Sequence, residues 1–270
     1  MARFLSILPL LAGALAHEHH GTSLFPRAAA VAPPTFGYHG LTGPLNWFNL
    51  NQTANEMCAK GTHQSPIDLS QSFLLADASS NPQISLSAAP HGAEFINLGT
   101  TVEVMGANGT LVKNGKTSKL AQFHFHSPSE HSINGVYYPL EVHFVFQADD
   151  ASLSVVGFVI DIGGSSFEPL GTLAASLDEI PQHGNETITK PLDFARLERH
   201  FKKFGTYQYS GSLTTPPCSE GVAWTVSAKP IAVDMRSFNA FRDVLKFNAR
   251  YTQNNPDGVN LLQNIADTLH

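Results

Sequence analysis

Short apolar or alternating runs, separated by clusters of Gly, Asn, Pro and Ser, recur along most of this 270-residue chain. Such runs between turn-forming residues are typical of β-strands. Helical periodicity appears in two places, around residues 170–177 and 235–247. We therefore expect a mostly β protein with minor α. The clearest runs are EFINLGTTVEVMG, LAQFHFH, LEVHFVFQ, LSVVGFVIDIG and GVAWTVSAKPIAV.

The composition favours one compact domain and argues against nucleic acid or an anionic membrane as a partner. Hydrophobic residues make up 42% of the chain and charged residues only 14%, so a large core can be buried. The net charge of -6 comes without long acidic or basic runs. Because the electrostatic footprint of a nucleic-acid or anionic-membrane protein is missing, neither partner is expected and small-molecule chemistry is favoured.

The first 16 residues, MARFLSILPLLAGALA, have the pattern of a secretory signal peptide. Arg3 precedes an apolar run that is short for a membrane span, and a small-x-small signal predicts cleavage after Ala16. We expect a secreted, extracellular protein with a tether or pro-segment at 17–34 and one folded domain at 35–270. No membrane anchor is evident in the sequence, and nothing in it sets the oligomeric state.

Two further features agree with secretion. Three Asn-x-Thr sequons, at Asn51, Asn108 and Asn185, are candidate glycosylation sites in polar settings. The chain has two cysteines, Cys58 and Cys218. In an oxidising compartment, a single disulfide between them is the expected state.

The stretch QFHFH places chemistry on one face of a predicted strand. Side chains two apart on a strand share a face, roughly 6.6 Å apart along the chain, so Gln122, His124 and His126 point together. Phe123 and Phe125 then point into the opposite layer. One face is therefore predicted to carry chemistry and the other to pack.

The next run, LEVHFVF, repeats this arrangement with Glu141, His143 and Val145 on one face. A hairpin-like return would bring His143 beside the first two histidines. Three neutral imidazoles suit zinc and leave a fourth position for water. Paired histidines on a strand are more often hydrogen-bonded or half-exposed than metal-bound. However, Gln122 and Glu141 stand two residues before candidate ligands, where they could fix the ring tautomers.

These motifs resemble those of the alpha-class carbonic anhydrases. The resemblance rests on QFHFH, SEH and LEVHFV, with HQSPIDL upstream, SLTTPPCSEGVAW at 212–224 and FNARYTQ at 247–253, and it covers about residues 36–253. It implies a single catalytic domain built on a central, largely antiparallel, strongly twisted sheet of about ten strands. Zinc would lie at the base of a conical cleft, and cis peptides are implied at Ser65-Pro66 and Pro216-Pro217.

The resemblance also implies roles for individual residues. Thr214 matches the hydroxyl that accepts a hydrogen bond from zinc-bound hydroxide and donates its own proton to Glu130. His131 matches a buried hydrogen-bonding histidine, and Tyr38 a tyrosine that organises water. The implied zinc ligands and the residues that hold them are His124, His126 and His143, with Gln122, Glu141 and Asn248. The implied substrate pocket consists of Val145, Val155, Leu213, Thr215 and Trp224.

The implied activity is that of a carbonate dehydratase, a lyase that reversibly hydrates carbon dioxide to bicarbonate and a proton. Zn²⁺ would be the cofactor, with no organic cofactor needed, and carbon dioxide, bicarbonate and water would be the partners. Thr100 stands where many fast family members carry a proton-shuttling histidine. Because a threonine hydroxyl cannot hold a proton near neutral pH, proton transfer is expected to limit turnover at low buffer. His39 and His63 are possible substitutes.

Two alternatives come from other classes. An inactive, carbonic-anhydrase-like binding domain would be favoured by the loss of a ligand histidine, and all three are present. A secreted metal-sequestering protein is suggested by His17-Glu18-His19-His20. Cleavage after Ala16 would make His19 the third residue, which suits a square-planar copper or nickel site. A disordered or removed pro-segment is the simpler interpretation.

Overall fold

The computed structural model describes residues 31–70 and 75–269. The predicted signal peptide and the segment His17–His20 lie outside the described residues. Within the described part, no helix has the length and apolar character needed to cross a bilayer.

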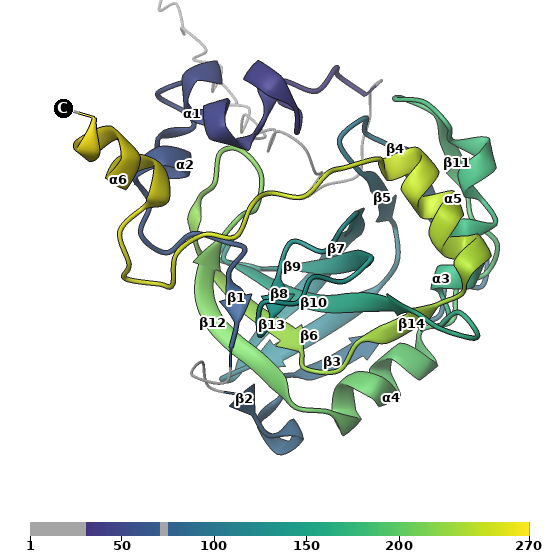
Figure 1. Ribbon diagram of the computed structural model, residues 1–270. Coiled ribbons are helices and arrows are strands. Elements are labelled where there is room, and N and C mark those ends of the chain that lie inside the picture. The colour runs from purple at the N-terminus through teal and green to yellow at the C-terminus, as the bar shows by residue number, and fades with distance from the viewer. Residues whose placement is uncertain (1–30, 71–74, 270) are drawn as a thin grey trace, which may run out of the picture.

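A large twisted sheet of twelve strands forms the centre of the described structure (Figure 1). Its main path runs β11-β4-β5-β7-β9-β10-β13-β12-β2, with β3 and β6 continuing from β7 and β14 pairing with β10. The strands are β2 (Leu75–Ala76), β3 (Gln83–Leu86), β4 (Glu94–Asn97), β5 (Val102–Met105), β6 (Gly109–Lys113), β7 (Lys116–His126), β9 (Leu140–Ala148), β10 (Leu153–Ile162), β11 (Glu186–Ile188), β12 (Thr206–Ser212), β13 (Glu220–Ser227) and β14 (Ile231–Val233).

Most neighbours in this sheet are antiparallel, while β10 pairs in parallel with β13 and β14. A separate parallel pair joins β1 (Asp68–Leu69) to β8 (Ser132–Ile133). The prediction of a mostly β, largely antiparallel single domain is confirmed. The sheet has twelve strands rather than about ten, because short edge segments such as β2, β11 and β14 extend it.

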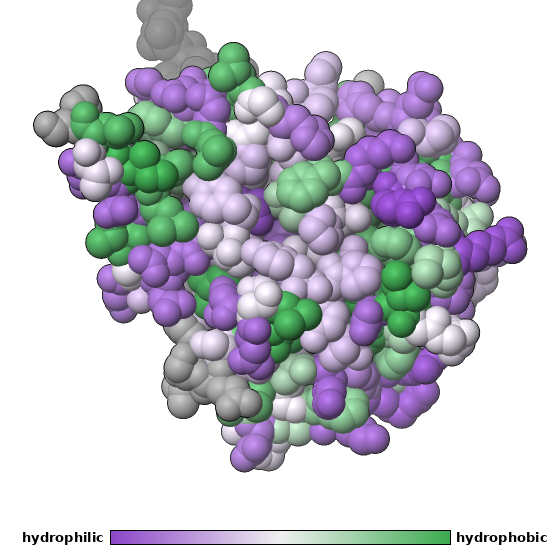
Figure 2. Space-filling view, viewed as in Figure 1, coloured by the Kyte–Doolittle hydropathy of each residue, from purple (hydrophilic) through white to green (hydrophobic). Residues whose placement is uncertain are grey.

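Helices are short and lie around the sheet. Their bounds are α1 (Trp47–Leu50), α2 (Glu56–Lys60), α3 (Leu170–Ala174), α4 (Ala195–Lys203), α5 (Met235–Leu245) and α6 (Leu261–Thr268). The two predicted helical segments correspond to α3 and α5, whereas sequence reasoning did not identify α4 and α6. In Figure 1, α3, α4 and α5 follow one side of the molecule, and α1, α2 and α6 gather at another. Apolar surface collects over this second group in Figure 2. Exposed apolar side chains in or next to these helices include Leu45, Ile265 and Leu269.

The two faces of the sheet bury different clusters. On one face Phe123, Phe125 and Phe144 join the buried residues of α3, α4 and α5 in the larger core. On the other face Val145, Val155 and Trp224 form a smaller cluster. This division follows from the two-residue period of a strand, because Phe144 and Val145 are neighbours in β9 and must point opposite ways.

A third buried cluster attaches the N-terminal part of the fold to a loop beyond β12. It contains Phe36, Trp47 and the disulfide between Cys58 and Cys218, so the predicted bridge is confirmed. The two predicted cis peptides are also present, and Ser127-Pro128 and Glu168-Pro169 are cis as well.

The helix α4 contains a histidine whose ring is buried among aromatic side chains. The His200 ring lies 5.5 Å from the Phe167 ring and 4.8 Å from the Phe204 ring, centroid to centroid, and its Nε2 is 2.9 Å from the Lys229 carbonyl oxygen. Burial lowers the pKa of His200, and the nearby charges of Arg196 and Lys203 lower it further. The folded protein therefore favours the neutral ring.

This pKa shift predicts a loss of stability in acid. An unfolded histidine has a pKa of about 6.5, so between that pH and the lower folded pKa the unfolded chain binds more protons than the folded one. The contribution of His200 is therefore complete above about pH 6.5 and falls as the pH drops. In urea unfolding followed by tryptophan fluorescence, His200→Gln should lose less stability than the wild type between pH 7 and pH 5. Equal losses of stability in His200→Gln and in the wild type would contradict the conclusion that the folded protein favours the neutral His200 ring.

Candidate metal centre

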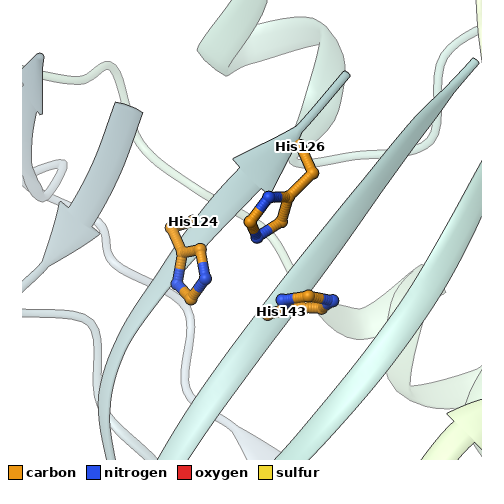
Figure 3. A group of neighbouring side chains, drawn as sticks. All are labelled: His124, His126 and His143. Atoms are coloured by element: carbon orange, nitrogen blue, oxygen red, sulfur yellow. The ribbon is translucent and has the colours of Figure 1, made fainter. Parts of the chain in front are cut away.

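Three buried histidines meet on the face of the sheet opposite the phenylalanine core. In the register of β7 and β9, His124 stands directly opposite His143, and His126 lies two residues further along β7. The ring centroids are 4.6 to 5.3 Å apart. Figure 3 shows the two rings of β7 and the ring of β9 turned toward a common point. One nitrogen from each ring lies within 4.8 Å of the others, so the predicted convergence is present.

Each ring also has one nitrogen engaged with an oxygen outside the centre. His124 Nδ1 lies 2.9 Å from Gln122 Oε1, His126 Nδ1 2.9 Å from the Asn248 carbonyl oxygen, and His143 Nε2 2.9 Å from Glu141 Oε1. These oxygens only accept hydrogen bonds, so the engaged nitrogens carry the protons. The lone pairs are left on Nε2 of His124, Nε2 of His126 and Nδ1 of His143.

The donor set fits a zinc ion. Three neutral imidazole nitrogens with their tautomers fixed from outside are the protein ligands of a catalytic zinc, which keeps a fourth position open. The buried Nε2 of His126 has no hydrogen-bond partner in the described structure, as expected for an atom that serves a metal. The structure thus places Gln122, Glu141 and Asn248 beside the histidines that they were predicted to hold.

The surroundings favour the neutral form of the two histidine rings on β7. Burial lowers the pKa of His124 well below its ordinary value, and the proximity of His126 and His143 lowers it further. Burial also lowers the pKa of His126, although the Glu130 carboxylate opposes this effect. Metal binding requires neutral imidazole, so the lowered pKa values of these two rings favour it.

Glu141 connects the centre to the surrounding fold. Its Oε1 accepts from His143 and, at 2.7 Å, from His131 Nδ1, while its Oε2 accepts from the backbone N–H groups of Glu130 and His131 at 2.9 Å each. Burial opposes ionisation of Glu141. Attraction to His131 and His143 and the hydrogen bonds from both rings outweigh that effect, so the pKa of this carboxyl lies well below its ordinary value.

His131 belongs to a chain of hydrogen bonds rather than to the ligand set. Its Nε2 lies 2.7 Å from the Tyr209 hydroxyl, which lies 2.8 Å from Ser65 Oγ. Ser65 in turn accepts from the backbone N–H of Ser212, one residue before Leu213. The structural place of His131 agrees with the hydrogen-bonding role that the resemblance implies.

Glu130 lies beside the histidines. Its Oε2 is 3.5 Å from His126 Nε2 and 4.0 Å from His143 Nδ1, and its Oε1 accepts from the backbone N–H of Arg250 at 2.8 Å. Within the described residues, Glu130 Oε2 has no hydrogen-bond partner and Thr214 makes no hydrogen bond with it. The pairing of Thr214 with Glu130 therefore stays a prediction.

The predicted apolar pocket residues come together next to His143. Val155 of β10 pairs with Val145 of β9 and with Trp224 of β13. The Trp224 ring lies 4.8 Å from the His143 ring, and its Nε1 donates to the Ser212 carbonyl oxygen at 3.0 Å. Leu213 packs against the same cluster and Thr215 is buried in the adjoining loop.

The residues considered for proton transfer have different surroundings. Thr100 is 6% exposed, its carbonyl accepts from Asn248 Nδ2 at 3.0 Å, and its hydroxyl has no partner in the described structure. His39 is exposed, with its ring centroid 6.0 Å from that of Phe247. His63 Nε2 lies 2.9 Å from an Asp257 carboxylate oxygen. Among the described residues, His63 thus has a carboxylate partner and His39 has none.

Tyr38 and Arg250 both lie near Glu130. Burial raises the pKa of Tyr38 well above its ordinary value, and the charge of Glu130 raises it further. Sequence reasoning did not single out Arg250, whose buried guanidinium donates to Gln64 Oε1 at 3.0 Å and to the Ser65 carbonyl oxygen at 2.7 Å. Arg250 lies in the motif FNARYTQ, on which the family resemblance partly rests, and this motif could have pointed to it.

The sequence of the chain matches a known protein family. The family model described as eukaryotic-type carbonic anhydrase matches residues 42–265. A carbonic anhydrase from Pectobacterium atrosepticum is 34% identical over 81% of this chain and 86% of its own length. Alpha carbonic anhydrase 5 of Arabidopsis thaliana is 35% identical over 75% of this chain and 73% of its own.

Solved structures agree with these sequence matches. The fungal alpha carbonic anhydrase of Aspergillus oryzae superposes with a TM-score of 0.81 and 46% identity, covering 86% of this chain and 98% of that one. The alpha-carbonic anhydrase of Photobacterium profundum gives a TM-score of 0.70 and 35% identity, covering 84% and 98%.

The hydrogen bond from His124 to Gln122 predicts a measurable loss of metal affinity in Gln122→Ala. Without the acceptor, the His124 ring loses its fixed tautomer, and zinc affinity should fall about 10- to 100-fold. Competition with a fluorescent zinc chelator measures this change. Gln147→Ala, in the neighbouring strand β9 but away from the rings, is the matched control. Equal affinities for Gln122→Ala and the control would refute the role of Gln122.

Proposed function

Since the chain belongs to the eukaryotic-type, or alpha, carbonic anhydrase family and is a carbonic anhydrase, we propose that it hydrates carbon dioxide with a zinc ion held by His124, His126 and His143. The observation that carries the proposal is the set of three converging ring nitrogens, each with its tautomer fixed from outside the centre. An ion at this point would have one position open to water.

A zinc ion held by these residues would supply a Lewis acid that lowers the pKa of a bound water molecule to about 7, a magnitude known for carbonic anhydrases themselves. The protein supplies the shape and the hydrogen bonds around that water. Val145, Val155 and Trp224 present an apolar surface beside His143, which suits an uncharged, apolar substrate such as carbon dioxide.

Thr214 and Glu130 are proposed to orient the attacking oxygen. An ionised carboxylate can only accept hydrogen bonds, so a hydroxyl that pairs with Glu130 must donate its proton to it. The lone pairs of Thr214 would then accept from the nucleophile and direct its attack on carbon. The unpartnered Oε2 of Glu130, buried beside two of the histidines, supports this role because it is ready to receive a donor.

Secretion is proposed on the signal-peptide pattern and has indirect support. The disulfide between Cys58 and Cys218 suits an oxidising compartment. The three sequon asparagines, Asn51, Asn108 and Asn185, are all exposed, so a glycan at any of them would not disturb the core. Sequencing the mature N-terminus would test cleavage after Ala16 and whether residues 17–20 remain as a second metal site.

An inactive binding domain is a less favoured alternative. All three ligand histidines are present and oriented, and the matched relatives named above are carbonic anhydrases. No described feature favours a purely binding role.

Removing one of the three histidines tests the proposed ligand set. His143→Ala removes one of three zinc ligands, so purified protein should lose its stoichiometric zinc and its carbon dioxide hydration together. Metal analysis and stopped-flow hydration measure the two properties, and a melting curve checks that the variant is folded. Full activity in verified zinc-free His143→Ala protein would refute the assignment of His143 as a zinc ligand.

Proton export from the centre can be tested through Thr100. The Thr100 hydroxyl cannot carry a proton near neutral pH, so turnover should rise steeply with added imidazole-type buffer. Thr100→His should raise turnover at low buffer and leave the second-order rate constant for carbon dioxide nearly unchanged. Fast, buffer-independent turnover in the wild type would contradict the prediction. In that case His39→Ala tests whether the exposed His39 has taken over the relay.

A further inference from the structure

The solvent side of α4 carries a row of basic side chains. At about 100° per residue, four of them fall within an arc of about 120°. Leu197 and Phe201 lie on the opposite side of the helix and are buried in the larger core. The four residues, all exposed, form what we call the α4 basic row: Arg196, Arg199, Lys202 and Lys203.

Most of the charge in this row is not neutralised. Lys202 pairs with Glu198 at 3.2 Å, and the other carboxylate oxygen of Glu198 is taken by the backbone N–H of Leu86. Among the described residues, Arg196, Arg199 and Lys203 make no ion pair with a carboxylate. The chain as a whole has a net charge of -6. The α4 basic row is therefore opposite in sign to the rest of the protein.

Helix stability alone does not account for the row. Cations in the last turn interact favourably with the helix dipole, which explains Lys202 and Lys203. Arg196 lies in the first turn, where a positive charge is unfavourable. Its guanidinium is instead held over the Phe167 ring at 3.8 Å and donates to the Ser166 carbonyl oxygen at 3.3 Å.

Other contacts order and extend the positive surface. Lys203 Nζ lies 5.2 Å from the centre of the Phe204 ring. The exposed Lys229 adjoins the helix, because its carbonyl accepts from His200 of α4. The charges of Arg196 and Lys203 also help to lower the pKa of the buried His200. Ordered, unpaired cations lose less entropy when they bind an anion.

The row lies on the far side of the sheet from the metal centre. The buried side chains of α4 belong to the same core as Phe123 and Phe144, whereas His124 and His143 point to the opposite face. A large ligand on α4 would therefore leave the histidine face open to substrate.

We propose that the α4 basic row binds a linear anionic polysaccharide through its sulfate or carboxylate groups. Arg196 and Lys203 are seven residue steps apart along the helix, a span of about 10 Å, which suits a few consecutive sugars. Arginine forks match sulfate and carboxylate oxygens. Duplex nucleic acid fits less well because a single row offers few phosphate contacts on an acidic protein. A membrane fits less well because the row has no large apolar side chain to insert.

The test uses the full zinc-loaded protein and immobilised polymers at about 50 mM salt, where exposed charges are weakly screened. Size-defined heparin fragments present sulfate and carboxylate, polygalacturonate presents carboxylate alone, and dextran is the neutral control. The variant Arg196→Gln/Arg199→Gln/Lys203→Gln should bind at least about tenfold more weakly than the wild type, since three charge-assisted contacts are lost. Binding of polygalacturonate as tight as that of heparin would assign the site to carboxylate.

The control variant Lys60→Gln/Lys116→Gln/Lys119→Gln removes three charges from exposed lysines elsewhere and should bind like the wild type. Melting curves verify that both variants are folded, and saturating polymer should leave carbon dioxide hydration unchanged. The proposal is overturned if both variants weaken equally, if the wild type binds neither polymer above dextran, or if duplex DNA binds more tightly than either. These outcomes do not depend on the hydration activity, so they are separate from the test of the proposed function.

Discussion

The pairing of β7 with β9 is the constraint on which the metal centre depends. This antiparallel register sets His124 directly across from His143 and places His126 one pleat away on the same face. The two-residue period then fixes the rest, because it sends Phe123, Phe125 and Phe144 into the opposite core. A slip of one residue would exchange the two faces, burying imidazoles in the phenylalanine core and exposing aromatic rings at the site. Packing of the phenylalanine core therefore fixes the register of β7 and β9, and this register sets the positions of the three histidines.

The hydrogen bonds behind the histidines decide which nitrogen of each ring faces the centre. Gln122 and Glu141 come from the same two strands as the rings, whereas the Asn248 carbonyl comes from the segment after α5. Glu141 also receives two backbone N–H groups and the His131 ring, so its carboxylate is fixed from several directions. The geometry of the centre therefore rests on groups from well-separated parts of the sequence.

Local pattern sufficed to predict the strands, the shared face of the histidines and the residues two positions before them. The family resemblance supplied what pattern could not, such as the role of Asn248, which lies 122 residues from the ring that it holds. Neither source identified the contact of His131 with Tyr209 or that of Tyr209 with Ser65, because 78 and 144 residues separate these partners and only the folded sheet brings them together. The helix α4 was missed because only Leu197 and Phe201 mark its buried face among many charges. The hydrogen bond between Thr214 and Glu130, implied by the resemblance, is not formed in the described structure.

The central claim is that three ring nitrogens, selected by their outer hydrogen bonds, hold one zinc ion. A crystal structure of the zinc-loaded protein, with anomalous diffraction recorded at the zinc edge, tests it most directly. The account predicts a single ion bonded to Nε2 of His124, Nε2 of His126 and Nδ1 of His143, each at about 2.0 to 2.1 Å, with Glu130 and Glu141 unbound to metal. An ion bonded to His143 through Nε2, or coordinated by either carboxylate, would contradict it.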